Sequence, residues 1–194
     1  MDKDLTPEQS LATIEAMIAE AKRSFHRNSF YFMLWGALLI AAMVFNVVLA
    51  YMNNPLGPYS WGVAGVAGGL ISFLHGSRES KQHQVRTAMD RVIVWLWVAF
   101  VVTMLVTMIG AGVAGYNTPI GSIMVLTGLP TFVSGQLMRF RPLILGGILF
   151  WVLGTISFFV DVPVMAGLYV AAMFFGYIVP GYLLKRQEDA LRAA

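Results

Sequence analysis

Long apolar segments alternate with short polar linkers along most of this chain, and every lysine and arginine lies outside those segments. The apolar segments cover approximately residues 30–52, 59–74, 92–112, 120–138, 143–160 and 164–184. An α-helix needs about 20 apolar residues to cross the hydrocarbon of a bilayer. Only helices and closed barrels satisfy their backbone polar groups there. The pattern therefore predicts an all-α membrane bundle with six transmembrane helices, occupying residues 29–185.

The composition supports a membrane protein over a soluble domain. Hydrophobic residues make up 58% of the 194 residues and charged residues only 12%, whereas soluble domains carry about 25% charged residues. Cysteine is absent, which excludes disulfides, thiolate metal sites and cysteine nucleophiles.

The distribution of basic residues predicts the orientation in the membrane. All 13 Lys and Arg residues fall before residue 30, between 78 and 91, at 139 and 141, or after 184. Six spans place all of these on one face, and the positive-inside rule makes that face cytoplasmic. We therefore expect a multi-pass protein of the bacterial inner membrane with both termini in the cytoplasm. The opposite face carries a single charge, Asp161.

Residues 1–28 have the pattern of an amphipathic helix. Thr6 and Pro7 form a helix start, and apolar residues such as Leu11, Ile14 and Ile18 then recur every three or four positions. We expect this helix to lie along the cytoplasmic face of the bundle or to bind a partner helix. Residues 186–194 form a short cytoplasmic tail.

Residues 75–91 form the largest internal cytoplasmic segment. Ser77 is a candidate cap for a helix that continues into the third span, so the segment is either a solvated helical extension or a docking face. Its basic residues are candidates for contact with a partner or a lipid headgroup: Arg78, Lys81 and Arg86.

Arg139 and Arg141 are the strongest candidates for binding, because a very short turn holds both at the membrane interface. Their ligands would be anionic lipid headgroups or a cytoplasmic or membrane protein. The simpler interpretation is that these arginines only anchor the topology. Nucleic acid is not an expected partner, because no basic module stands apart from the membrane.

The interiors of the spans lack ionisable residues. Proton relays, ion pathways and voltage sensors place such groups near mid-membrane, so those functions are not expected. Pro130 and Pro180 fall inside apolar segments and could kink them. A carrier or channel for a small neutral or hydrophobic solute is the alternative function, with these candidate cavity-lining residues: Asn46, Thr107, Thr127 and Gln136.

Small residues predict where helices approach one another in a bilayer. The pair Gly65 and Gly69, together with Gly135, Gly146 and Gly176, are the expected close contacts. Such contacts join helices within one chain or between chains, so a homo-oligomer is left open.

Catalytic chemistry finds little support. The three histidines, His26, His75 and His83, lie at the edges of the spans, whereas an intramembrane Ser–His pair requires both groups at depth in the bundle. No phosphate-binding glycine loop is present. We expect a non-enzymatic protein with no catalytic residue, no metal site and no cofactor, acting as a binding, scaffolding or regulatory accessory subunit.

A resemblance to a known group of proteins covers nearly the whole chain. It is carried by three stretches: residues 30–36 (FYFMLWG), the turn 139–144 (RFRPLI) and residues 176–181 (GYIVPG). In these stretches the protein resembles a group of small, uncharacterised bacterial six-helix integral inner-membrane proteins. The resemblance implies a fold and a location, and it implies no site residue.

Overall fold

The structure is a computed structural model that describes residues 29–82, 88–113, 115 and 120–193. The amphipathic helix expected in residues 1–28 and the candidate residue Arg86 lie outside the described residues.

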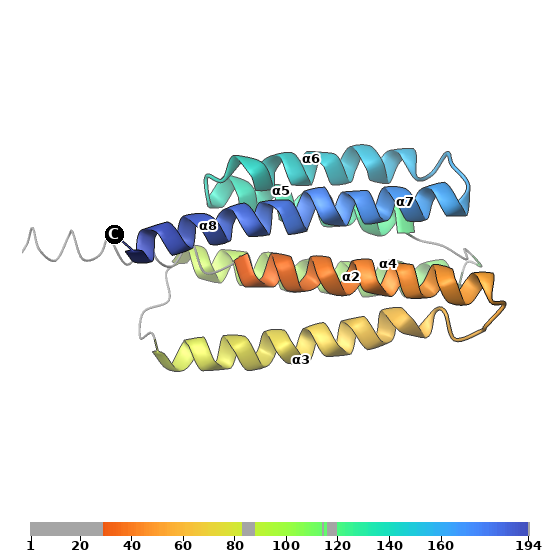
Figure 1. The fold of residues 1–194 in the computed structure, drawn as a ribbon, viewed down its shortest axis with the longest axis horizontal. Helices are drawn as coiled ribbons and strands as arrows, with labels where there is room; N and C mark the ends of the chain where they lie inside the picture. Colours follow the sequence, from red (N-terminus) through yellow and green to blue (C-terminus); the bar gives the residue numbers. More distant parts are fainter. Residues whose placement is uncertain (1–28, 83–87, 114, 116–119, 194) are drawn as a thin grey trace, which may run out of the picture.

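Six long helices run up and down the molecule (Figure 1). Within the described residues there are no strands. The last of the six helices is interrupted by one π-helical turn, η1. The elements are α2 (Ser29–Tyr51), α3 (Tyr59–Gln82), α4 (Ala88–Val113), α5 (Ile120–Leu137), α6 (Arg141–Ile156) and α7 (Val162–Met173), which continues through η1 (Phe174–Ile178) into α8 (Val179–Ala193).

Four of the helical stretches are long and apolar enough to cross a membrane: Ser29–Tyr51, Arg91–Val113, Ile120–Leu137 and Val162–Ala190. Helix α6 is apolar but has only 16 residues. Helix α3 is long enough, with 24 residues, but its last two turns are polar. The predicted all-α fold, with helices long and apolar enough to span a membrane, is thereby confirmed for the described residues, whereas the number of six spans stays a prediction.

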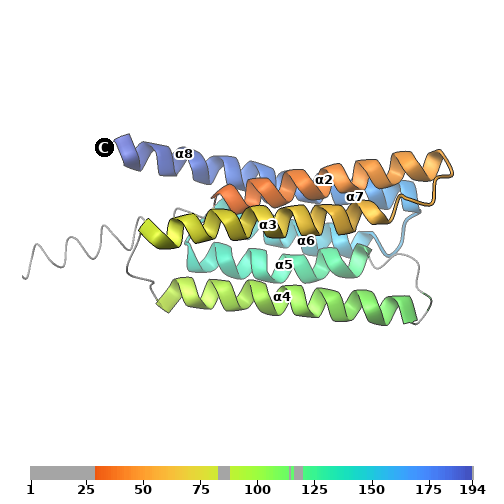
Figure 2. The same ribbon diagram turned by 90° about the horizontal axis from the view of Figure 1, so that it is seen from below.

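The helices divide into a central group and two outer helices. Helices α5 and α6 form the closest pair, and α2 packs against α7, η1 and α8. Helix α3 packs mainly on α2, and α4 mainly on α5 (Figures 1 and 2). Most large side chains of α4 are exposed, among them Trp95, Val106 and Ile109. The outer helices therefore present apolar surfaces to their surroundings.

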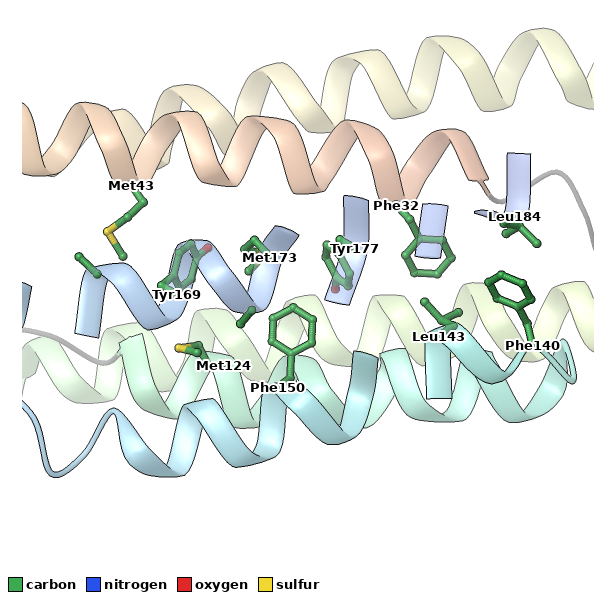
Figure 3. Close-up of a cluster of buried hydrophobic side chains, with 12 residues drawn as sticks. Phe32, Met43, Met124, Phe140, Leu143, Phe150, Tyr169, Met173, Tyr177 and Leu184 are labelled. Atoms are coloured by element: carbon green, nitrogen blue, oxygen red, sulfur yellow. The ribbon is translucent and has the colours of Figure 1, made fainter. Parts of the chain in front are cut away.

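The core fills the space between α2, the α7–α8 helix and the α5–α6 pair (Figure 3). Phe150 and Tyr177 pack edge to face, with ring centroids 5.1 Å apart. Phe32 adds a second edge-to-face contact to Tyr177 at 5.6 Å. Such aromatic pairs contribute about 0.5–1.5 kcal/mol beyond the burial of their surface. Nearer the α5–α6 turn, Leu184 lies over Phe140 and Leu143 (Figure 3).

Glycines bring α5 and α6 into backbone contact. A Cβ atom added at Gly147 would lie 2.6 Å from the backbone nitrogen of Phe132, and one added at Gly135 would lie 2.6 Å from that of Ile144. The expected contacts at Gly135, Gly146 and Gly176 are therefore present. Within the described part of the chain nothing lies within 4 Å of a Cβ at Gly65 or Gly69, so a contact there stays a prediction for an interface between chains.

The segment 75–82 ends α3 and does not begin α4. Ser77 lies inside α3, where its hydroxyl donates to the carbonyl of Leu74 at 3.0 Å. The expectation that Ser77 caps a helix leading into the next span is therefore wrong. Apolar periodicity could not locate this boundary, because both helices extend past their apolar parts.

A proline accounts for the irregular turn in the last helix. Pro180 has no N–H to donate to the carbonyl of Gly176, four residues earlier. Just before this point the chain forms the π-helical turn η1, in which the N–H of Val179 donates to the carbonyl of Phe174. The Gly176 carbonyl instead faces α6, where it would lie 2.8 Å from a Cβ at Gly146. Glycine at 146 lets the two backbones meet at this point.

Candidate functional site at the basic end of the bundle

The described basic residues gather at one end of the bundle, which we call the basic end. It comprises the end of α3, the start of α4, the α5–α6 turn and α8 (Figure 1). Asp161 lies at the opposite end, in the α6–α7 connection. The described basic residues at the basic end are Arg78, Lys81, Arg91, Arg139, Arg141, Lys185, Arg186 and Arg192.

The α5–α6 turn is fixed by backbone hydrogen bonds. The N–H of Phe140 donates to the Gly135 carbonyl at 2.9 Å, and the N–H of Arg139 donates to the Gln136 carbonyl at 3.1 Å. This pair of bonds is a Schellman helix end, which requires a left-handed residue. Arg139 is that residue, with φ of +50°. The turn therefore holds its arginine in one backbone conformation.

Helix α6 begins directly after Phe140. The carbonyl of Phe140 accepts from the N–H groups of Leu143 and Ile144 at 3.1 and 3.3 Å. Its side chain is buried, so the turn is anchored in the core. Arg141 occupies the first position of α6 and Pro142 the second, where a missing N–H costs no helical hydrogen bond.

Arg139 and Arg141 are both exposed. Neither side chain forms a hydrogen bond or ion pair within the described part of the chain. The sequence prediction that a short turn presents two arginines together is confirmed in its geometry. Their binding partner stays a prediction.

The other predicted basic residues are spread along α3. Arg78 is exposed on α3. The backbone of Lys81 belongs to the same helix, but its side chain lies outside the described residues. Both residues belong to the part of α3 that lies at the same end of the bundle as the α5–α6 turn (Figure 1), and their role in binding stays a prediction.

Helix α8 is joined to the start of α2 by a polar contact that the sequence did not reveal. The Ser29 hydroxyl donates to Glu188 Oε2 at 2.6 Å, and the Ser29 N–H donates to Oε1 at 3.3 Å. A carboxylate is favoured at a helix N-terminus, where free N–H groups point outward. The two residues are 159 positions apart, so no local pattern could have predicted the pairing.

His75 belongs to an aromatic cluster between α2 and α3. Its ring stacks on Phe30 with a centroid distance of 4.0 Å, and it meets Tyr31 edge to face at 5.7 Å. In the described residues no group of three or more His, Asp or Glu side chains is placed to hold a metal ion.

The predicted cavity-lining residues lie on three different helices of the bundle. Asn46 lies beside Gly57 in the α2–α3 connection, and Gln136 is exposed near the α5–α6 turn. The Thr107 hydroxyl donates to the Thr103 carbonyl on its own helix. Thr127 is buried and donates to the carbonyl of Ile123. None of the four lines either of the two hollows on α6 described below, and their role in lining a cavity stays a prediction.

A polar contact does link α5 to η1 in the core. The Thr131 hydroxyl donates to the Thr127 carbonyl at 2.7 Å and lies 3.4 Å from the Tyr177 hydroxyl. Because a threonine hydroxyl has one proton, Tyr177 is the donor in the second contact. Ser134, one turn further along α5, is buried with no partner for its hydroxyl in the described structure.

An apolar hollow of about 420 Å³ opens on the surface between α6 and the η1–α8 segment. The buried residues Gly146 and Pro180 lie at its base. The sequence prediction missed this hollow, because it depends on the α6–η1 backbone contact and not on a local pattern. It is lined by Pro142, Leu145, Gly146, Leu149, Phe175, Val179 and Pro180.

A second hollow of about 410 Å³ lies on α6 and is lined by Trp151, Val152, Thr155 and Ile156. All four residues come from one helix, so this hollow is a depression on the surface of α6.

Comparisons of the chain with protein-family models, with curated proteins and with solved structures found no match. The resemblance to small six-helix inner-membrane proteins therefore stays a prediction.

Proposed function

We propose that this protein is a non-enzymatic accessory subunit of the bacterial inner membrane, which binds a partner protein or anionic lipid headgroups through its basic end. The six helices each cross the bilayer in this proposal, and both termini lie in the cytoplasm. Support for the orientation comes from the gathering of the described basic residues at one end of the bundle, since such residues are retained on the cytoplasmic side.

The α5–α6 turn is the observation that carries the proposal. It presents two exposed guanidinium groups on a backbone fixed by two hydrogen bonds and a buried phenylalanine. Glycine or asparagine is the usual left-handed residue at such a helix end, yet position 139 is arginine. Arginine at this position accepts the strain of a left-handed backbone, and the turn thereby carries an exposed positive charge.

The absence of cysteine allows a direct test of orientation. We expect Arg139→Cys to react with a membrane-impermeant maleimide only after the cells are permeabilised, and Asp161→Cys to react in intact spheroplasts. The opposite labelling pattern would reverse the topology. Labelling of both positions from one side would mean that α6, the helix between the two residues, does not cross the membrane. The proposal requires α6 to cross, so this result would contradict it.

Binding is tested by purifying the tagged full-length chain from membranes and quantifying the proteins and lipids that co-purify. Arg139→Gln with Arg141→Gln should lower the amount of bound partner or anionic lipid by roughly 10- to 30-fold, taking about 1 kcal/mol per basic residue near an anionic surface. The matched control is Arg91→Gln with Lys185→Gln, which removes two exposed charges elsewhere at the basic end. Equal co-purification with both double variants would contradict the proposal.

A further inference from the structure

The hollow between α6 and the η1–α8 segment has the chemistry of an acyl-chain site. Its lining side chains are all apolar. Leu145 and Phe175 stand on opposite sides and are 65% and 57% exposed, so the hollow opens outward instead of into the core. In a bilayer this face of the bundle meets lipid.

Basic side chains follow the hollow at the end nearest the α5–α6 turn. Arg141 precedes Leu145 by four residues and therefore lies on the same face of α6, one turn nearer the basic end. On the opposite wall, Arg186 follows Val179 by seven residues, two helical turns, and again shares its face. The position of Leu184 over Phe140 and Leu143 (Figure 3) brings this part of α8 level with the α5–α6 turn.

The two arginines are free to bind an anion. Both side chains are exposed, and neither has a hydrogen bond or ion pair within the part of the chain that the structure describes. The carboxylate of Glu188, two residues after Arg186, is engaged by Ser29. An apolar hollow that ends between two uncompensated guanidinium groups is complementary to a molecule with a hydrocarbon chain and a phosphate.

We propose that this groove binds one anionic phospholipid, with an acyl chain in the apolar hollow and the phosphate between Arg141 and Arg186. Guanidinium groups bind phosphate through paired N–H donors. The Gly146–Gly176 backbone contact sets the depth of the groove, because a side chain at either position would separate α6 from η1. The inference rests on the membrane placement proposed above and names the lipid class that the basic end recognises.

The test uses the full-length chain, delipidated in detergent and titrated with dioleoylphosphatidylglycerol or dioleoylphosphatidylcholine. Native mass spectrometry counts the lipids bound to each chain. The wild-type protein should retain one phosphatidylglycerol in preference to phosphatidylcholine. Arg141→Gln with Arg186→Gln should reduce that preference about tenfold or more. The control Arg91→Gln with Lys185→Gln removes the same charge from two other exposed positions at the basic end and should preserve the preference.

A second variant tests the hollow independently of charge. Val179→Phe replaces a small aliphatic side chain with a phenyl ring in the hollow. It should weaken binding of both lipids, because the ring fills the space for the acyl chain. The proposal would be overturned if the groove double variant and its charge-matched control lost the preference for phosphatidylglycerol equally, or if the wild-type protein showed no such preference. If Val179→Phe does not fold, these two double variants alone decide.

The outcome is distinguishable from failure of the proposed function. Arg186→Gln and Val179→Phe alter only the groove. An unchanged phosphatidylglycerol preference in Arg186→Gln, together with unchanged binding of both lipids by Val179→Phe, would dismiss the groove while the α5–α6 turn could still bind a protein. Inorganic phosphate and glycerol 3-phosphate serve as soluble competitors. Displacement of the lipid by millimolar phosphate alone would show simple anion binding at the arginines and would overturn the requirement for an acyl chain.

Discussion

Glycine has opposite roles in the α5–α6 pair and in α3. In the pair, a Cβ at Gly128 would lie 2.5 Å from the Trp151 ring, and one at Gly147 would lie 2.6 Å from the Phe132 backbone. In α3, a Cβ at Gly62, Gly65 or Gly69 would meet nothing within 4 Å. The same residue type therefore marks the closest helix contact of the molecule and one of its most open faces.

The spacing of the glycines explains the difference. In α3, Gly65 and Gly69 are four residues apart, the spacing usually associated with membrane helix pairs. In α5 the close glycines are Gly121, Gly128 and Gly135, and in α6 they are Gly147 and Gly154. These are seven residues apart, the repeat with which two helices meet along a continuous seam. A seven-residue repeat of glycine on two consecutive helices was the better signal of contact.

The largest effect should come from adding one methyl group to the α5–α6 contact. Gly147→Ala places a Cβ against the Phe132 backbone, which cannot move aside as a flexible side chain would. We expect the free energy of unfolding to fall by about 1–3 kcal/mol. Unfolding of the purified protein in mixed micelles, followed by circular dichroism, measures this loss.

Gly69→Ala is the matched control in α3. With open space around the new methyl group, the substitution should raise the free energy of unfolding by about 0.5–1 kcal/mol through helix propensity alone. A loss of stability at Gly69 similar to that at Gly147 would mean that another helix covers this face of α3, and the contrast between the two regions would not hold.

A smaller effect is expected where the tightly packed region contains a polar group without a partner. Ser134 is 1% exposed, and its hydroxyl has no hydrogen bond in the described structure. Ser134→Ala should raise the free energy of unfolding by about 1 kcal/mol, because a buried unsatisfied hydroxyl is removed. Ser157→Ala is the comparison, since that hydroxyl donates to the Leu153 carbonyl at 2.8 Å. A destabilised Ser134→Ala protein would reveal a partner for the hydroxyl.

The smallest effect is expected from substitutions in two helix-ending turns, one after α5 in the closely packed pair and one after α2, just before α3. Arg139 and Asn53 both adopt positive φ, +50° and +52°, at Schellman helix ends with equivalent hydrogen bonds. Asparagine tolerates this conformation better than arginine does. Arg139→Gly should therefore stabilise the protein by about 0.5–1 kcal/mol, and Asn53→Gly by less. Equal gains in thermal unfolding experiments would remove the distinction between the two turns.

The helical fold was predictable because apolar segments of membrane length leave the backbone few alternatives. The turn at Arg139 was predictable for a related reason: two apolar segments separated by so few residues must reverse direction there. Prediction was less successful at the ends of helices. Ser77 lies within α3 because polar residues can extend a membrane helix beyond its apolar part, and no hydrophobic pattern marks where the extension stops.

The candidate site was harder to predict because it depends on pairs of residues distant in the sequence. The contact between Ser29 and Glu188 spans nearly the whole chain. The hollow beside Arg141 requires the α6–η1 approach at Gly146 and Gly176. Asn46 and Gln136 are polar residues within apolar segments; Asn46 lies beside Gly57 in the α2–α3 connection, and Gln136 is exposed near the α5–α6 turn.

The π-helical turn η1 fits one residue more into the last helix than regular α-helical geometry would. An α-helix rotates by about 100° with each residue. Closing Phe174–Ile178 into α-helical geometry with no residue removed would therefore rotate everything after it by up to about that angle. Leu184 would then leave its place over Phe140 and Leu143, and Arg186 would turn away from α6. The π turn thus absorbs one residue that would otherwise redirect a whole helix face.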